Sequence, residues 1–198
     1  MHYFTFIMIS EHGPVEALVA RTLSPFDESL EIDPYQEHLS PREIRTMAER
    51  YEIDPSDLAA LEGMMPRWNG RPGGVDEKGL FTWSTDNPDG KWDWYVIGGR
   101  WDGAIHGRPS GHDPYDENRA EFNVIAAGLL AEANYLPDQS PAFLVTPEGV
   151  WLAHEAIVVG AWPQFHVETK EDAVWLDEVR STLAAYPEQR VVGIDIHS

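Results

Sequence analysis

The sequence predicts an α+β domain with a largely antiparallel sheet and with helices on one face of that sheet. Three observations lead to this fold class: strand-like segments open and close the chain, helical periodicities alternate with strand pairs between them, and no repeat or flexible linker divides the sequence. The 198 residues, 42% of them hydrophobic, are enough for one substantial core. We therefore expect a single domain over residues 1–198, with residues 24–75 as an inserted loop and helical region.

The first half of the chain is expected to hold one strand and two helices. Residues 3–9 form a continuous run of β-branched, aromatic and other apolar side chains that ends at a turn, which predicts a buried strand. After a loop rich in Pro and acidic residues, Ser40 and Glu43 form a capping-box pattern, and the apolar residues behind them recur at helical spacing. A second, shorter helix is expected from Asp54 to the Gly-rich segment 68–74.

The second half is expected to add two hairpins, two helices and a closing strand. Alternating apolar residues predict a first hairpin with strands at 80–85 and 92–97, and a second hairpin around the turn 146–149. The remaining elements are a helix over 122–133, a helix that begins near Thr169 and runs past Leu183, and a strand over 190–197. If the first and last strands lie antiparallel side by side, this order favours a ferredoxin-like topology.

Charge and cysteine content exclude several classes of function. The 34 Asp and Glu residues outnumber the 14 Lys and Arg residues and give a net charge of −20, which repels phosphate backbones at long range. We therefore expect no direct nucleic-acid binding. The absence of Cys excludes disulfides and thiolate nucleophiles. The opening segment lacks the features of a signal peptide and is too short to span a bilayer, so a cytoplasmic protein without a membrane partner is expected.

The segment over residues 86–103 is the strongest candidate for a binding site. It gathers Trp, Tyr, Lys and Arg around a pair of glycines, and such a combination offers stacking surfaces, backbone amides and cations to a planar anion such as a nucleotide. The candidate ligand-binding residues are Lys91, Trp92, Asp93, Trp94, Tyr95, Gly98, Gly99, Arg100 and Trp101. Two other interpretations stay open: the aromatic residues form a core in which Arg100 pairs with a nearby acid, or they form a protein interface.

The same segment carries a resemblance to a known family. Residues 87–101 read Asn-Pro-Asp-Gly-Lys-Trp-Asp-Trp-Tyr-Val-Ile-Gly-Gly-Arg-Trp, which resembles the hallmark of a family of uncharacterised bacteriophage and bacterial, often actinobacterial, proteins. The resemblance extends to residues 25–28, 146–151 and 195–197, and so touches most of the chain. Members of that family tend to carry Cys where this chain has Ile196, which argues against an essential thiol. The resemblance implies a phage-associated or accessory-genome origin and points to no particular chemistry.

The two ends of the chain supply a second candidate site. Asp195 and His197 lie two residues apart on the last predicted strand and so point to the same side. If the terminal strands pair antiparallel, His2 lies beside them, and the three side chains then form a candidate site for a divalent metal such as zinc. The alternative is that these polar residues lie at the chain ends because they are exposed to solvent there, with no role in binding.

The sequence contains no Ser-hydrolase, zinc-protease, P-loop or dinucleotide-binding motif, so no catalytic residue is assigned. The leading hypothesis is a phage-type accessory protein that binds a small anionic, nucleotide-like ligand at the Trp-rich hairpin. One alternative is an acidic interaction module that inhibits a host protein. The other is a metal-dependent hydrolase that uses His2, Asp195 and His197.

Overall fold

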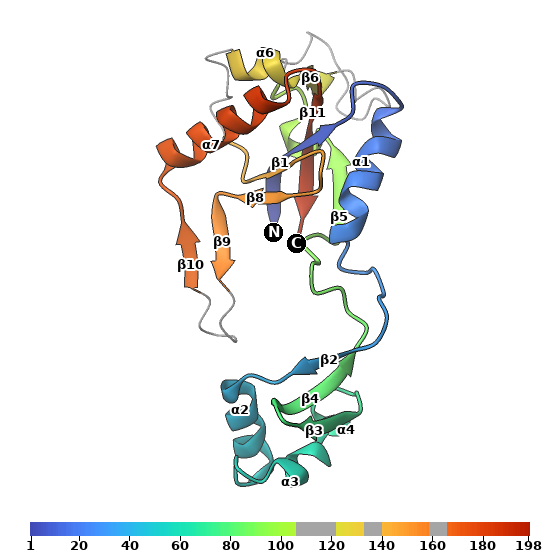
Figure 1. Ribbon diagram of the computed structural model, residues 1–198, viewed down its shortest axis with the longest axis vertical. Coiled ribbons are helices and arrows are strands. Elements are labelled where there is room, and N and C mark those ends of the chain that lie inside the picture. The colour runs from blue at the N-terminus through green and yellow to red at the C-terminus, as the bar shows by residue number, and fades with distance from the viewer. Residues whose placement is uncertain (106–121, 133–139, 159–165) are drawn as a thin grey trace. The chain divides into compact units, whose positions relative to one another are not determined.

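The computed structural model describes residues 1–105, 122–132, 140–158 and 166–198 (Figure 1). The chain divides into two compact units, and each of them has its own sheet. The main unit comprises Met1–Leu30, Pro88–Ile157 and Val167–Ser198, and the second unit is built on Glu31–Asn87. The second unit thus begins and ends later in the sequence than the inserted region predicted over residues 24–75.

The main unit is organised around a mixed, mostly antiparallel sheet whose centre is formed by the first and last strands. Strand β1 (His2–Ile9) pairs antiparallel with β11 (Arg190–His197) along its whole length, so that His2 lies opposite His197. The neighbouring strands are β5 (Trp94–Ile97) and β6 (Val124–Ala126) beside β11, then β7 (Phe143–Val145) beside β1 and β8 (Trp151–Ala153) beside β7. This arrangement confirms the predicted α+β class and largely antiparallel sheet.

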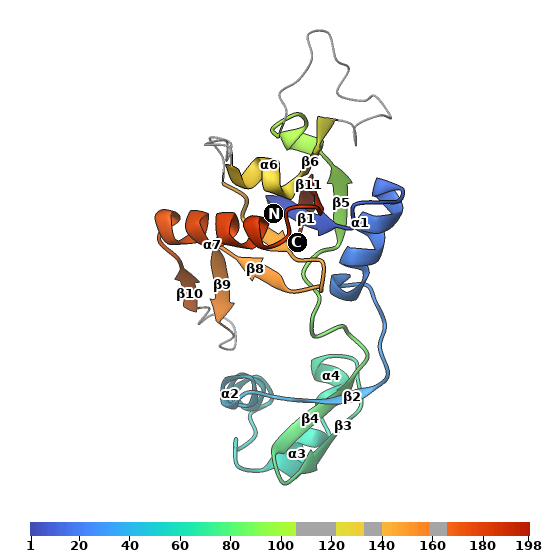
Figure 2. The same cartoon turned by 45° about the horizontal axis from the view of Figure 1, so that its top comes forward.

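Helices cover both faces of this sheet, so the prediction of helices on one face is wrong. Helix α1 (Val15–Leu23) buries Leu18, Val19 and Leu23 against one face. Helices α6 (Ala127–Glu132) and α7 (Asp172–Ala185) cover the other face (Figure 1 and Figure 2). The reason lies in the central strands, which are apolar on both faces and therefore need cover on both.

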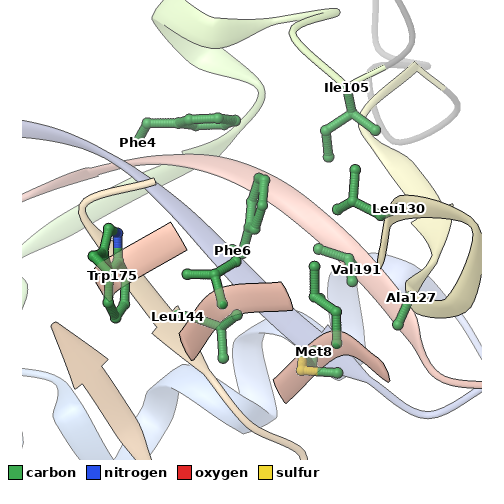
Figure 3. Packing of buried hydrophobic residues seen from close by; sticks show 11 residues of the cluster. Phe4, Phe6, Met8, Ile105, Ala127, Leu130, Leu144, Trp175 and Val191 are labelled. Carbon is green, nitrogen blue, oxygen red and sulfur yellow. The ribbon is translucent and has the colours of Figure 1, made fainter. Parts of the chain in front are cut away.

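The core on the α7 face is the more aromatic of the two. Phe4, Phe6 and Met8 alternate along β1 and pack against Trp175 and other residues of α7 and α6 (Figure 3). The indole nitrogen of Trp175 donates a hydrogen bond to the carbonyl oxygen of Pro141 at 2.6 Å, so this fully buried ring leaves no polar atom unsatisfied.

The ferredoxin-like topology is not confirmed. The first and last strands do lie antiparallel side by side, but β1 is also the direct parallel neighbour of β7. In a split β-α-β unit an antiparallel strand separates the two parallel strands. No such strand lies between β1 and β7.

Short elements complete the main unit. The 3₁₀ turn η1 (Ser24–Phe26) follows α1, and the 3₁₀ turn η2 (Gly99–Trp101) follows β5. Strands β9 (Glu155–Val158) and β10 (His166–Thr169) form a separate two-stranded sheet. In the part of the chain that the structure describes, no helix has the length and apolar character needed to cross a membrane.

The second unit is a three-stranded antiparallel sheet packed against short helices. Its strands are β2 (Tyr35–His38), β4 (Gly79–Ser84) and β3 (Gly73–Asp76), with β4 in the middle. Its helices are α2 (Pro41–Tyr51), α3 (Leu58–Glu62) and α4 (Met65–Trp68). The predicted capping box of α2 is confirmed, because the Ser40 side chain accepts from the Glu43 amide and the Glu43 carboxylate accepts from the Ser40 amide.

Three predicted elements differ from the structure. The predicted hairpin 80–97 does not form, because β4 pairs with β2 and β3 while β5 pairs with β11 in the other unit. The helix expected over 122–133 is a strand and a short helix, since Val124–Ala126 pairs with the beginning of β11. The helix expected from Asp54 is split into α3 and α4. The second predicted hairpin, by contrast, is confirmed as β7–β8.

Candidate functional site

Strand pairing brings the two candidate sites of the sequence to one end of the main sheet. In the register of β1 and β11, His2 lies opposite His197, and in the register of β5 and β11, Trp94 lies opposite the same His197. Both chain ends lie at this end of the sheet (Figure 1). The six residues that meet here are called the sheet-end site: His2, Asp93, Trp94, Arg100, Asp195 and His197.

The alternation of β11 decides which side chains reach the site. Ile194 and Ile196 belong to the core on the α1 face, so Asp195 and His197 point to the opposite face, as the sequence predicts. His2 is in line with Phe4 of β1, which packs in the core on the α7 face. The site therefore extends the α7 face of the sheet beyond its apolar core.

A buried carboxylate lies at the centre of the site. Asp195 is only 2% exposed, and its Oδ1 lies 2.8 Å from Nδ1 of His2. Its Oδ2 accepts a hydrogen bond of 3.2 Å from the backbone amide of Arg100, and the Arg100 Nε lies 3.9 Å away. These partners compensate the loss of water around a buried charge, and they hold the His2 ring in one orientation.

A second, more exposed histidine–aspartate pair lies beside the first. Nδ1 of His197 is 2.7 Å from Oδ1 of Asp93, and the Asp93 amide donates to the His197 carbonyl oxygen at 3.1 Å. The hydrogen bond from His197 lowers the pKa of the Asp93 carboxyl below its ordinary value. The rings of His2 and His197 contact each other edge to face, with centroids 5.1 Å apart.

An exposed indole and an exposed guanidinium complete the site. Trp94 is 48% exposed, and its ring centroid lies 5.8 Å from that of His2. The side chain of Arg100 is 65% exposed, and its contact with Asp195 is longer than a direct hydrogen bond. Most of the guanidinium therefore stays in solvent.

The other aromatic candidates belong to the core. Trp92 donates from its indole nitrogen to the Leu23 carbonyl oxygen at 2.9 Å and packs with Tyr95 on the α1 face. Burial raises the pKa of the Tyr95 hydroxyl above its ordinary value. Trp101 stacks on Phe4, with ring centroids 5.5 Å apart. For these three residues the interpretation of the aromatic segment as core is the better one.

The glycine pair serves packing, and one of its two amides is already bonded within the protein. Gly98 and Gly99 both have positive φ angles, and the Gly98 amide already donates to the Gly193 carbonyl oxygen at 2.9 Å. A Cβ atom on Gly99 would lie 2.4 Å from the Cβ of Asp195, and one on Gly98 would lie 2.5 Å from the side-chain Nδ2 of Asn123. The pair is needed so that the chain can turn closely over Asp195.

Lys91 and the metal hypothesis have weaker support. Lys91 is exposed, and its backbone amide donates a hydrogen bond of 2.8 Å to the carbonyl oxygen of Phe26, the last residue of η1. His2, Asp195 and His197 do lie together, but within the described ranges no group of three or more His, Cys, Asp or Glu side chains is arranged to hold a metal ion. In both pairs the Nδ1 atom faces a carboxylate of the protein itself.

A cavity of about 450 Å³ opens to solvent elsewhere in the main unit, between the β7–β8 turn and α7. At its edge the Tyr186 hydroxyl donates to the Glu148 carboxylate at 2.8 Å. This contact lowers the pKa of Glu148 and raises the pKa of Tyr186. No local pattern in the sequence predicts this cavity, because it is formed by two segments that are distant in the chain.

Comparisons with protein-family models, curated proteins and solved structures find no match to this chain.

Proposed function

We propose that the chain binds a small anion with a planar group, such as a nucleotide, at the sheet-end site. The observation that carries the proposal is that two groups around the Asp195–His2 pair stay exposed: the Trp94 ring, 48% exposed and 5.8 Å from the His2 ring, and the Arg100 guanidinium, 65% exposed and 3.9 Å from Asp195. An indole face stacks on a nucleobase, and a guanidinium donates two parallel hydrogen bonds to a phosphate.

The supporting groups make this surface ordered before any ligand arrives. The Arg100 backbone is held by the hydrogen bond that its amide donates to Asp195. The same carboxylate orients His2, which contacts the Trp94 ring. A preorganised surface loses less conformational entropy on binding than a mobile one.

The net charge of −20 favours a small ligand over a polymer. A long polyanion would experience the repulsion of the whole acidic surface, whereas a nucleotide needs only the local field of one cation. A small ligand also matches the extent of the site, which consists of a few side chains at the end of three adjacent strands.

Isothermal titration calorimetry with a panel of nucleoside mono- and diphosphates tests the proposal. Arg100→Ala should weaken binding by about 10-fold or more, since a hydrogen bond to a charged group contributes about 1.5–3 kcal/mol. Trp94→Ala should weaken binding by a similar factor through lost stacking, which contributes about 1–3 kcal/mol per base.

Two matched variants control for general effects of substitution. Trp83 in β4 is 42% exposed, and Arg21 in α1 is exposed on the opposite face of the main sheet from the site. Trp83→Ala and Arg21→Ala should leave the affinity unchanged. If none of the nucleotides binds, or if the control variants lose as much affinity as the site variants, the proposal is wrong.

A further inference from the structure

We propose that His2 and His197 act as a general acid and a general base that hydrolyse a small phosphodiester bound at the sheet-end site. This inference rests on the proposed function, because Arg100 and Trp94 are the groups that would hold the substrate. It adds a reaction, and with it a substrate class, to what would otherwise be a binding surface.

The orientation of the two imidazoles carries the inference. In both rings Nδ1 faces a carboxylate, at 2.8 Å for His2 and 2.7 Å for His197. A carboxylate on Nδ1 fixes the tautomer that carries its proton there, so that Nε2 becomes the atom that exchanges a proton with a substrate. Asp195 and Asp93 are thus positioning residues, and the two histidines are the candidate catalytic residues.

The second observation is that two such rings are in contact. Their centroids lie 5.1 Å apart, which places two proton-transfer groups within reach of one phosphorus centre. A third imidazole, His38 in the second unit, faces its Asp76 partner with Nε2 at 3.0 Å. His38 thus faces its carboxylate with the other ring nitrogen, whereas at the sheet-end site two neighbouring rings both face a carboxylate with Nδ1.

The chemistry of phosphodiester hydrolysis fits this pair. A water oxygen forms a bond to phosphorus while one imidazole accepts the water proton on Nε2. The bond from phosphorus to the leaving oxygen then breaks, and the second imidazole, which enters the reaction protonated, donates its Nε2 proton to that oxygen. The two rings end with exchanged protonation states, and proton exchange with solvent restores them. The exposed Arg100 guanidinium stabilises the added negative charge on the phosphoryl oxygens.

The charged groups around the rings bear on the pH dependence. His2 faces the Asp195 carboxylate, His197 faces the Asp93 carboxylate, and Arg100 lies on the far side of Asp195. The amino group of Met1 donates to the Ser198 carbonyl oxygen next to them. The reaction requires one neutral and one protonated imidazole, so the rate should pass through a maximum and fall on both sides of it.

The test measures hydrolysis of two probes, bis(4-nitrophenyl) phosphate and a 2′,3′-cyclic nucleotide, by the purified full chain. We expect turnover that persists in EDTA, a bell-shaped dependence of kcat on pH, and a fall in kcat of about 100-fold or more for His2→Ala and for His197→Ala. Nucleotide affinity in these two variants should change by only a few-fold.

Further variants separate catalysis from damage to the fold. His12→Ala removes an exposed histidine that pairs only loosely with Glu11, at 3.9 Å, and should keep full activity. Asp93→Asn changes an exposed positioning residue and should shift one limb of the pH profile of kcat, which a merely structural role would not do. Asp195→Asn should have the larger effect, provided that circular dichroism shows a folded protein.

The outcomes distinguish this inference from the proposal on which it rests. Nucleotide binding without hydrolysis of either probe overturns the acid–base pair and leaves the binding function intact. Turnover that requires an added divalent metal also overturns it and favours the metal-dependent alternative. Equal turnover in the wild type and in both histidine variants overturns it as well, because the two imidazoles then contribute nothing to the rate. Failure of both binding and hydrolysis overturns both proposals.

Discussion

The two units contain similar sets of side chains, but they differ in how far an arginine side chain is already bonded within the protein. Each has a histidine–aspartate pair, an exposed indole and an arginine: His38, Asp76, Trp83 and Arg71 in the second unit correspond in kind to residues of the sheet-end site. Arg71, however, donates to both carboxylate oxygens of Asp86 at 2.7 Å and to Ser84 at 3.0 Å.

The difference therefore lies in how the guanidinium is used. The donors of Arg71 are taken up by Asp86 and Ser84, whereas Arg100 meets Asp195 only at 3.9 Å through Nε and stays 65% exposed. Composition alone cannot separate a structural ion pair from a binding site. The hydrogen bonds of the guanidinium do separate the two cases, because N–H donors that are already bonded to a carboxylate are not available to a phosphate.

The largest effect on stability is expected at the glycine pair. Gly99→Ala combines a φ of 56° with a Cβ placed 2.4 Å from that of Asp195. The strained backbone and the overpacking together should lower the free energy of unfolding by about 3 kcal/mol. Urea denaturation of the full chain measures this change.

The matched control for this prediction is Gly70→Ala in the second unit. Gly70 also has a positive φ, 78°, but a Cβ there would meet nothing within 4 Å. Only the backbone cost of about 1 kcal/mol is expected. Equal losses at both positions would show that Asp195 is not packed under Gly99.

Replacing each of the two arginines by alanine should separate an effect on ligand affinity from an effect on stability. Arg71→Ala removes a bidentate but exposed ion pair and should cost about 0.5–1 kcal/mol of stability, with no change in nucleotide affinity. Arg100→Ala should change stability by less than about 0.5 kcal/mol while it lowers the affinity. Calorimetry and urea denaturation on the same two variants provide the comparison. A loss of affinity in Arg71→Ala would contradict the contrast between the two units.

The smallest effect concerns acid titration of the two paired carboxylates. The hydrogen bond from His197 lowers the pKa of Asp93, and the hydrogen bond from His38 lowers the pKa of Asp76, in both cases below the ordinary value of 3.8. A lowered folded-state pKa stabilises the protein above the unfolded value, and this stabilisation is lost as the pH falls below 3.8 through the folded value.

Carbon-13 NMR of the side-chain carboxyls follows this titration directly. His197→Ala should return the Asp93 midpoint toward its ordinary value and leave Asp76 unchanged, and His38→Ala should do the reverse. The two units should thus behave alike in this respect. An unchanged Asp93 midpoint in His197→Ala would show that the pair does not form in solution.

Patterns local in sequence predict much of the fold. The strands at both chain ends, the β7–β8 hairpin, the capped helix α2 and the buried face of α7 follow from periodicity and end signals. Helix α1 is missed, although Leu18 and Val19 follow Val15 at helical spacing behind Pro14. The proximity of the turn at Gly13 obscures that signal.

Pairing between distant strands is what the sequence could not predict. Residues 80–85 and 92–97 read as the two arms of a hairpin, yet the strands that they contain belong to different sheets. For the site, antiparallel pairing of the chain ends correctly joins His2 to His197. The partner of Arg100 and the enclosure of Trp92 depend on β5 lying beside β11, which no local pattern encodes.

The origin suggested by the resemblance of residues 87–101 to phage and bacterial proteins stays a proposal. That string mixes residues of two kinds. Trp92, Tyr95 and the glycines are required by the packing of the main unit, whereas Trp94 and Arg100 are exposed. A shared string of this kind can therefore reflect a shared fold as well as a shared ligand.

The most direct test of the central claim follows the indole and guanidinium N–H signals in ¹H–¹⁵N NMR spectra during titration with a nucleoside monophosphate. The binding surface proposed for the sheet end predicts saturable shifts for Nε1–H of Trp94 and Nε–H of Arg100, with the Trp83 and Arg71 signals unmoved. Signals of Trp94 and Arg100 that stay in place at saturating nucleotide, or that move no more than those of Trp83 and Arg71, would contradict it.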